Sequence, residues 1–150
     1  MHTIRLDFTG TFEMIDLVQV MSDQLSRLVG LDDEALHWVG VSVRESVSNA
    51  IRHGNAGNAD KRVHVEFTAV PPPSSGLLIR VRDEGPGFDP ASVPDPLAPE
   101  NLLKPSGRGI LLMRNFMDEI LIRRAAEGGM EVLMVKRAHA GPHEPLLVAE

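Results

Sequence analysis

The chain has 150 residues, a formal net charge of −6 at pH 7 and no cysteine. A chain of this length favours a single domain with a stable core, and the lack of cysteine excludes disulfides, thiolate chemistry and Cys-ligated zinc. Its scattered Lys and Arg argue against direct nucleic-acid binding. With no apolar run near the roughly 18 residues of a membrane span and no signal pattern at the N-terminus, we expect a soluble, cytoplasmic protein without membrane contact.

The first part of the chain predicts one strand and two helices. Side chains alternate over residues 3–8, as in a short strand. Apolar residues then recur at helical spacing over 12–29, and Gly30 ends that helix. Asp32 is a suitable N-cap for a second helix over 33–53, because its side chain can accept a hydrogen bond from a free backbone N–H group.

A line of polar residues follows one stripe of the second helix. Glu45, Asn49 and His53 are spaced four residues apart and therefore lie on the same face. Such a line is either a solvated helix face or part of a site. For His53, packing at the helix end is favoured over chemistry, and a turn-rich loop follows at 54–60.

Two strands are predicted next, over 62–70 and 77–83, and the second ends on a carboxylate. Asp83 shares a face with three apolar residues of its strand, so it takes the place of a fourth. A carboxylate on an inward face is costly unless it accepts hydrogen bonds, and we therefore expect N–H donors around it. Gly85 and Gly87 leave room for a ligand or for close backbone, although a surface turn with an incidental Asp is the simpler alternative.

The proline-rich residues 88–105 show no periodicity and predict a functional lid or a disordered segment, which we expect to order on nucleotide binding. A third helix follows Ser106, and two strands at 119–123 and 130–137 flank a Gly-Gly hairpin signal. The order of elements predicts an α+β fold: a two-layer α/β sandwich with helices on one face of a mixed, mostly antiparallel sheet. The domain spans residues 1–137, and 138–150 form a C-terminal tail.

Three elements together supply the groups that a purine-nucleotide site with magnesium requires. Asp83 can accept from an exocyclic amine, and the Gly-x-Gly start of the third helix offers free N–H groups to phosphates. Asn49 supplies a hard oxygen for Mg²⁺, which uses few protein ligands. Gly-x-Gly alone also fits simple close packing, whereas the joint occurrence in this order favours the nucleotide.

At these residues the chain resembles the GHKL ATPase superfamily, which includes gyrase-type and histidine-kinase ATP-binding domains. Residues 45–50 are similar to its N box, 83–87 to its first glycine box and 107–109 to its second. The nearer similarity, over about residues 3–137, is to bacterial anti-sigma-factor serine kinases. It is carried by residues 49–55, 106–113, 115–119 and 129–137.

The resemblance implies a Bergerat ATP-binding fold with ATP and Mg²⁺ as cofactors. Asp83 would bind the adenine amino group, Asn49 would hold Mg²⁺, and Glu45 would orient or deprotonate the attacking hydroxyl. Either Lys104 or Arg108 would neutralise the γ-phosphate; relatives often carry an Arg in the lid where this chain has Lys104, which leaves that cation open. The nucleotide and its phosphates would be lined by Gly85, Gly87, Lys104, Ser106, Gly107, Arg108, Gly109 and Ile110.

The implied function is an ATP-dependent protein serine/threonine kinase that acts as an anti-sigma factor or similar partner-switching regulator. Its substrate would be a small anti-anti-sigma-type antagonist protein, its second partner a sigma factor or another regulator, and the resemblance also implies a homodimer. The alternative is an ATP-binding interaction module that captures a regulator without phosphotransfer. A detached histidine-kinase catalytic domain ranks third, because the chain has no room for a helical hairpin carrying a phosphoacceptor His.

Overall fold

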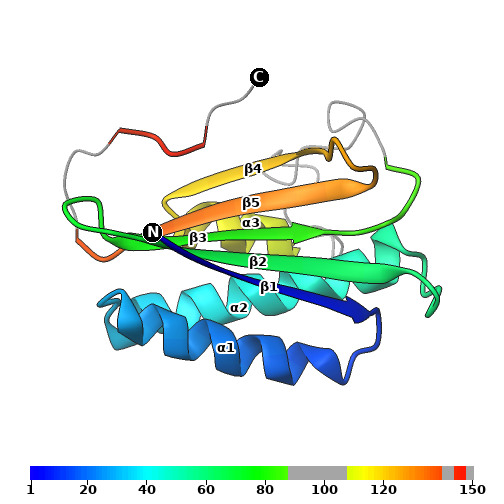
Figure 1. Ribbon diagram of the computed structural model, residues 1–150, viewed down its shortest axis with the longest axis horizontal. Helices are drawn as coiled ribbons and strands as arrows, with labels where there is room; N and C mark the ends of the chain where they lie inside the picture. The colour runs from blue at the N-terminus through cyan, green and yellow to red at the C-terminus, as the bar shows by residue number, and fades with distance from the viewer. Residues whose placement is uncertain (88–107, 140–143, 148–150) are drawn as a thin grey trace.

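The computed structural model describes residues 1–87, 108–139 and 144–147. The predicted lid, with Lys104, Ser106 and Gly107, lies outside these described residues. Helices cover one face of a single five-stranded sheet, so the predicted two-layer α+β sandwich is confirmed (Figure 1). In the described part of the chain, no helix combines the length and the apolar character that crossing a membrane requires.

The predicted elements occur in the predicted order, and apart from the second helix their ends differ from the predictions by at most two residues. They are β1 His2–Thr9, α1 Met14–Leu28, α2 Asp33–Asn49, η1 Ala50–Gly54, β2 Arg62–Val70, β3 Gly76–Arg82, α3 Arg108–Phe116, β4 Glu119–Arg124 and β5 Met130–Arg137. The N-cap is confirmed, since the Asp32 carboxylate accepts from the Ala35 N–H at 2.8 Å.

The second helix differs from its prediction at the C-terminal end. It stops at Asn49, and the five residues of η1 continue it as a π-helical turn. The wider turn is closed by the Asn55 N–H, which donates to the Ala50 carbonyl at 2.8 Å. Because this turn is wider than an α-helical one, it changes the direction of the chain just before the buried Asn55.

The sheet has the strand order β1-β2-β3-β5-β4, and all four neighbouring pairs are antiparallel. We predicted a mixed sheet, and the connectivity explains the difference. Helix α3 joins β3 to β4, which run in the same direction, but β5 lies between them and pairs with both. The hairpin at Gly128 and Gly129, both with positive φ, returns the chain into that gap.

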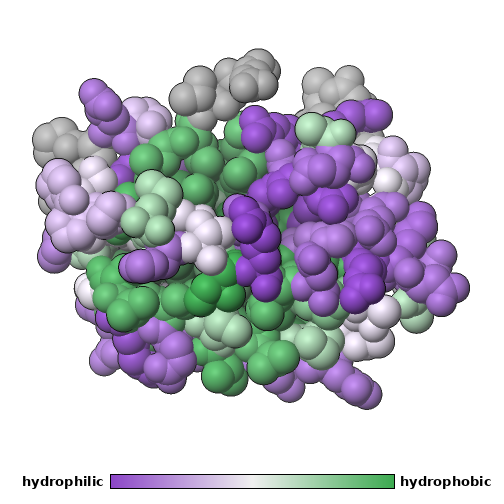
Figure 2. Space-filling model, viewed as in Figure 1, coloured by the Kyte–Doolittle hydropathy of each residue, from purple (hydrophilic) through white to green (hydrophobic). Residues whose placement is uncertain are grey.

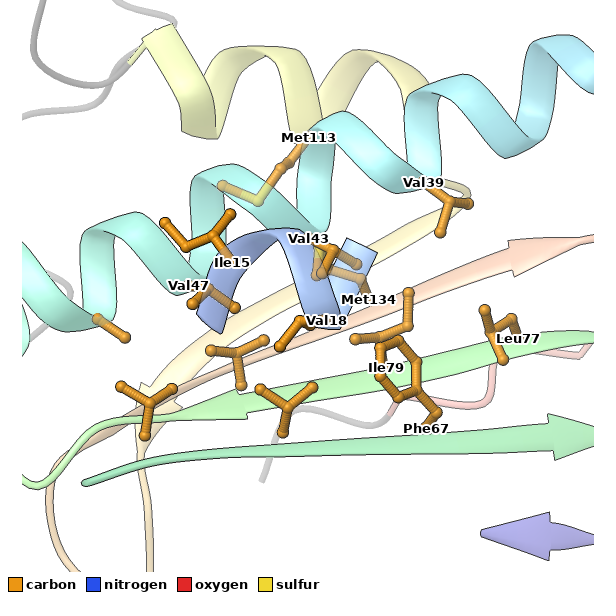
Figure 3. Close-up of a cluster of buried hydrophobic side chains, with 14 of the residues drawn as sticks. Ile15, Val18, Val39, Val43, Val47, Phe67, Leu77, Ile79, Met113 and Met134 are labelled. Atoms are coloured by element: carbon orange, nitrogen blue, oxygen red, sulfur yellow. The ribbon is translucent and has the colours of Figure 1, made fainter. Parts of the chain in front are cut away.

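One hydrophobic core joins the three α-helices to the covered face of the sheet. At its centre the Ser46 hydroxyl of α2 lies 3.1 Å from the Met113 sulfur of α3 and 3.7 Å from the Met134 sulfur of β5. This contact ties α3 to α2 and the sheet. The side chains around it include Ile15, Val18, Val39, Val43, Val47, Phe67, Leu77 and Ile79 (Figure 3).

The other face of the sheet is not covered by the helices. Ion pairs cross it near the C-terminal end of β3, such as Arg5 with Glu66 at 2.8 Å, and Figure 2 shows hydrophilic residues gathered over that end. At the other end, residues 144–147 lie beside β4, where the Leu146 and Leu147 N–H groups donate to the Glu119 carboxylate at 2.9 Å. The boundary between domain and tail stays a prediction.

Candidate functional site

The candidate site lies where the C-terminal ends of α2 and β3 meet the start of α3 (Figure 1). Two close approaches define it. The Asp83 carboxylate lies against Gly54, and the Glu45 carboxylate lies against Gly109. The fold therefore brings together the three elements that the sequence predicted to share a site.

Asp83 follows directly after β3 and is buried, with 6% of its surface exposed. Its Oδ1 accepts hydrogen bonds from the Gly85 N–H at 2.9 Å and the Met130 N–H at 3.1 Å, so the expected N–H donors are present. Among the described residues nothing donates to Oδ2, which points at Gly54. One carboxylate oxygen is thus held in place while the other can accept from a ligand.

Backbone without side chains surrounds this carboxylate. A methyl group at Gly54 would overlap Asp83 Oδ2, and one at Gly85 would overlap the Gly54 carbonyl oxygen. Gly87, with φ +73°, has room for a methyl group at 3.6 Å from the Met130 sulfur. Within the first glycine box, Gly85 therefore serves close backbone approach beside Asp83, and Gly87 takes a backbone conformation that favours glycine.

We expect Gly54→Ala to lower the free energy of unfolding by about 1–3 kcal/mol, because the new methyl group displaces Asp83 from a packed position. Gly40→Ala on α2 is the matched control. Its methyl group would meet only the ends of two side chains, Gln19 at 3.4 Å and Asp23 at 3.5 Å, and alanine is the better helix former. Urea unfolding monitored by circular dichroism measures both. Equal stability of Gly54→Ala and wild type would contradict the contact.

On α2, Glu45 and Asn49 are both half-buried and lie one turn apart. A methyl group at Gly109 would lie 2.5 Å from Glu45 Oε2, so only glycine lets the first turn of α3 come this close. Neither side chain makes a hydrogen bond with a described residue. Ile110 packs against the core behind this turn. Arg108 is the first residue of α3, and the structure describes its backbone only. His53 is exposed on η1.

The residues present fit a magnesium ion held jointly with a ligand. No group of three or more His, Asp or Glu side chains within the described ranges could bind a metal on its own. Asn49 offers a hard oxygen with no protein partner in the same part of the chain. Since Mg²⁺ usually takes one or two protein ligands and completes its shell with water and phosphate oxygens, Asn49 alone would suffice.

Sequence reasoning missed a polar network behind Asp83. Asn55 is 1% exposed, and its amide accepts from the Glu84 N–H at 2.8 Å and donates to the Arg62 carbonyl at 3.0 Å. The Glu84 carboxylate accepts from the Arg62 N–H at 2.7 Å and lies 3.0 Å from His64 Nε2. These contacts, the Arg62 N–H first, hold the pKa of Glu84 below its ordinary 4.5. Local sequence did not indicate the network, because Glu84 lies 29, 22 and 20 residues from Asn55, Arg62 and His64.

The model of the histidine kinase-like ATPase domain family matches residues 12–136. The chain belongs to this family. Its match covers α2, both predicted glycine boxes and the strands of the site, so the predicted GHKL resemblance is confirmed.

Relatives of this chain include an anti-sigma factor and a serine-protein kinase. The chain is 36% identical over 98 residues to an anti-sigma F factor of Bacillus velezensis, which covers 63% of this chain and 64% of that protein. It is 23% identical over 139 residues to the serine-protein kinase RsbW of Listeria monocytogenes, with 89% and 85% covered. The chain thus spans less than two thirds of the anti-sigma F factor that it matches.

A solved structure has the same fold. The RsbU and RsbW domains of a Mycobacterium tuberculosis protein superpose with a TM-score of 0.64 at 16% sequence identity, covering 91% of this chain and 32% of that one. At this identity the likeness concerns the fold. It agrees with the antiparallel sheet and the helical layer described above.

Proposed function

We propose that this protein binds ATP with Mg²⁺ beside Asp83 and transfers a phosphoryl group to a serine or threonine of a small antagonist protein. In this proposal it acts as an anti-sigma factor or similar partner-switching regulator, which captures a sigma factor or another regulator. Membership of the ATPase family and the relatives named for anti-sigma and serine-kinase roles support it. The observation that carries it is the buried Asp83 carboxylate with one oxygen left to accept.

The chemistry of that oxygen selects adenine. An exocyclic amine is a donor and can hydrogen-bond to Oδ2, whereas guanine presents a carbonyl oxygen at the same ring position and would be repelled. Since the Gly85 and Met130 N–H groups already hold Oδ1, the carboxylate needs no rearrangement when the base binds. Adenine recognition would therefore depend mainly on one fixed side chain.

In this proposal Glu45 orients the attacking hydroxyl. Its carboxylate lies at the first turn of α3, the helix end that favours phosphates, and one turn before Asn49. Phosphoryl transfer is governed mostly by positioning and charge, so a carboxylate that accepts a hydrogen bond from the hydroxyl is sufficient. When bound at Asn49, Mg²⁺ supplies positive charge to the phosphates.

A labelled-phosphate assay tests the proposal. Purified protein is mixed with ATP, Mg²⁺ and the small protein that co-purifies with it in an ATP-dependent manner. We expect label on a Ser or Thr of that protein. A pair that associates with ATP but transfers no label would contradict the kinase and favour the interaction-module alternative. Homodimerisation, which only the resemblance implies, stays a prediction.

A further inference from the structure

His64 lies on the uncovered face of the sheet between two carboxylates. In the strand register it is opposite Asp7 of β1 and Arg82 of β3. Its Nδ1 lies 2.5 Å from Asp7 Oδ1, and its Nε2 lies 3.0 Å from Glu84 Oε2. With 21% of the side chain exposed, the ring has little freedom to move away from either partner.

Both ring nitrogens therefore face an acceptor. A neutral imidazole has a single N–H group and can donate to only one carboxylate, whereas the imidazolium has two and can donate to both. The arrangement is fully satisfied only when His64 carries its second proton. Loss of that proton would leave one nitrogen lone pair facing a carboxylate oxygen.

The contact reaches the nucleotide site in two bonded steps. Glu84 is held by His64 and by the Arg62 N–H at its carboxylate, and by Asn55 at its own N–H. It stands between Asp83 and Gly85, the residue whose N–H holds Asp83 Oδ1. A shift of Glu84 would consequently move the turn that orients the adenine-binding carboxylate.

We propose that the His64 imidazolium is a positioning residue of the adenine site, and that loss of its second proton weakens adenine-nucleotide binding. The inference rests on the proposed function, because it assumes that Asp83 receives the base. His64 is not proposed to touch the base or the phosphates. It acts only through Glu84.

Other charged groups around the ring form ion pairs of their own, and the charge of Arg82 also acts on Glu84. Arg5 from β1 pairs with Glu66 of β2 at 2.8 Å, and Arg82 from β3 lies 3.7 Å from Glu127. These residues, with His64 and Asp7, line a pocket of about 200 Å³ on the open face. The two carboxylates at hydrogen-bond distance are thus the groups that act most directly on the ring.

Calorimetric titration with ADP at several pH values from about pH 6 to 9 tests the inference. We expect the Kd of the wild type to rise about fivefold over the range, a part of the roughly tenfold that a lost charge-assisted hydrogen bond represents. His64→Gln, which has no proton to lose, should bind weakly throughout and lack this component. Comparing the two cancels the titration of the nucleotide phosphates.

Glu66→Gln is the matched control, because Glu66 lies on the same strand and face but contacts Arg5 rather than Glu84. It should follow the wild-type pH profile. If His64→Gln unfolds, Glu84→Gln breaks the same contact from the other side and should lose the same component. If the wild type binds ADP and its Kd changes with pH in the same way as that of His64→Gln and of Glu84→Gln, this inference alone is overturned. Wild-type protein that binds no adenine nucleotide would overturn the proposed function as well.

Discussion

Asp83→Asn is expected to raise the Kd for ATP and for ADP by at least about 100-fold while the protein stays folded. The substitution keeps the shape of the side chain and the acceptor that meets the Gly85 and Met130 N–H groups. The other terminal atom, however, changes from an acceptor into an NH₂ donor. It would then face the donor amine of adenine, and two donors cannot hydrogen-bond to each other.

Isothermal calorimetry with Mg²⁺ measures this loss, and urea unfolding shows that it is not a loss of structure. We expect the free energy of unfolding to stay equal or to rise, because an uncharged amide is less costly to bury than a carboxylate. Asp33→Asn is the matched control, since Asp33 is exposed at the far end of α2. Unchanged nucleotide affinity in Asp83→Asn would refute the location of the base.

Glu45→Gln is expected to lower the rate of phosphoryl transfer by about 10²–10⁴-fold, the range typical for removal of a positioned acid–base group. Glutamine keeps the size of the side chain and therefore its close packing against Gly109. It removes the negative charge that strengthens the hydrogen bond from the hydroxyl. Because Glu45 is not assigned to the base or to Mg²⁺, nucleotide affinity should change little.

Label transfer at saturating ATP, together with calorimetry, separates these two effects. Glu34→Gln, exposed in the first turn of α2, serves as the control for loss of one helix carboxylate. A transfer rate equal to that of the wild type would remove Glu45 from the mechanism. Lost transfer with unchanged regulation of the partner would instead favour the interaction module.

Much of the fold was predictable because the repeating patterns of apolar residues are local. Alternation of period two decides which side chains share a strand face, and this alone predicts that Asp83 points inward with its apolar neighbours. Helical spacing likewise put Glu45 and Asn49 on one stripe of α2. The glycines beside Asp83 and at the start of α3 indicated close backbone approach, which the structure confirms at Gly85 and Gly109.

The π-helical turn was outside the reach of such patterns. An apolar stripe and a polar line continue through residues 50–53 much as they would in an α-helix, so periodicity predicted one helix to 53. The change of turn is stabilised by Asn55, whose amide is satisfied by Arg62 and Glu84. Those partners come from other parts of the chain, and only folding brings them to Asn55.

The sequence by itself determined the kinds of element, the inward direction of Asp83 and the residues available for nucleotide chemistry, because each depends on neighbours a few positions away. Tertiary structure alone decided the insertion of β5 between β3 and β4, and with it the Met130 N–H group that holds Asp83. It also decided the contact of His64 with Asp7 and Glu84, which lie 57 and 20 residues away in the chain. Hydrogen bonds between strands that are distant in the chain depend on register and on strand order, and local periodicity predicts neither of them.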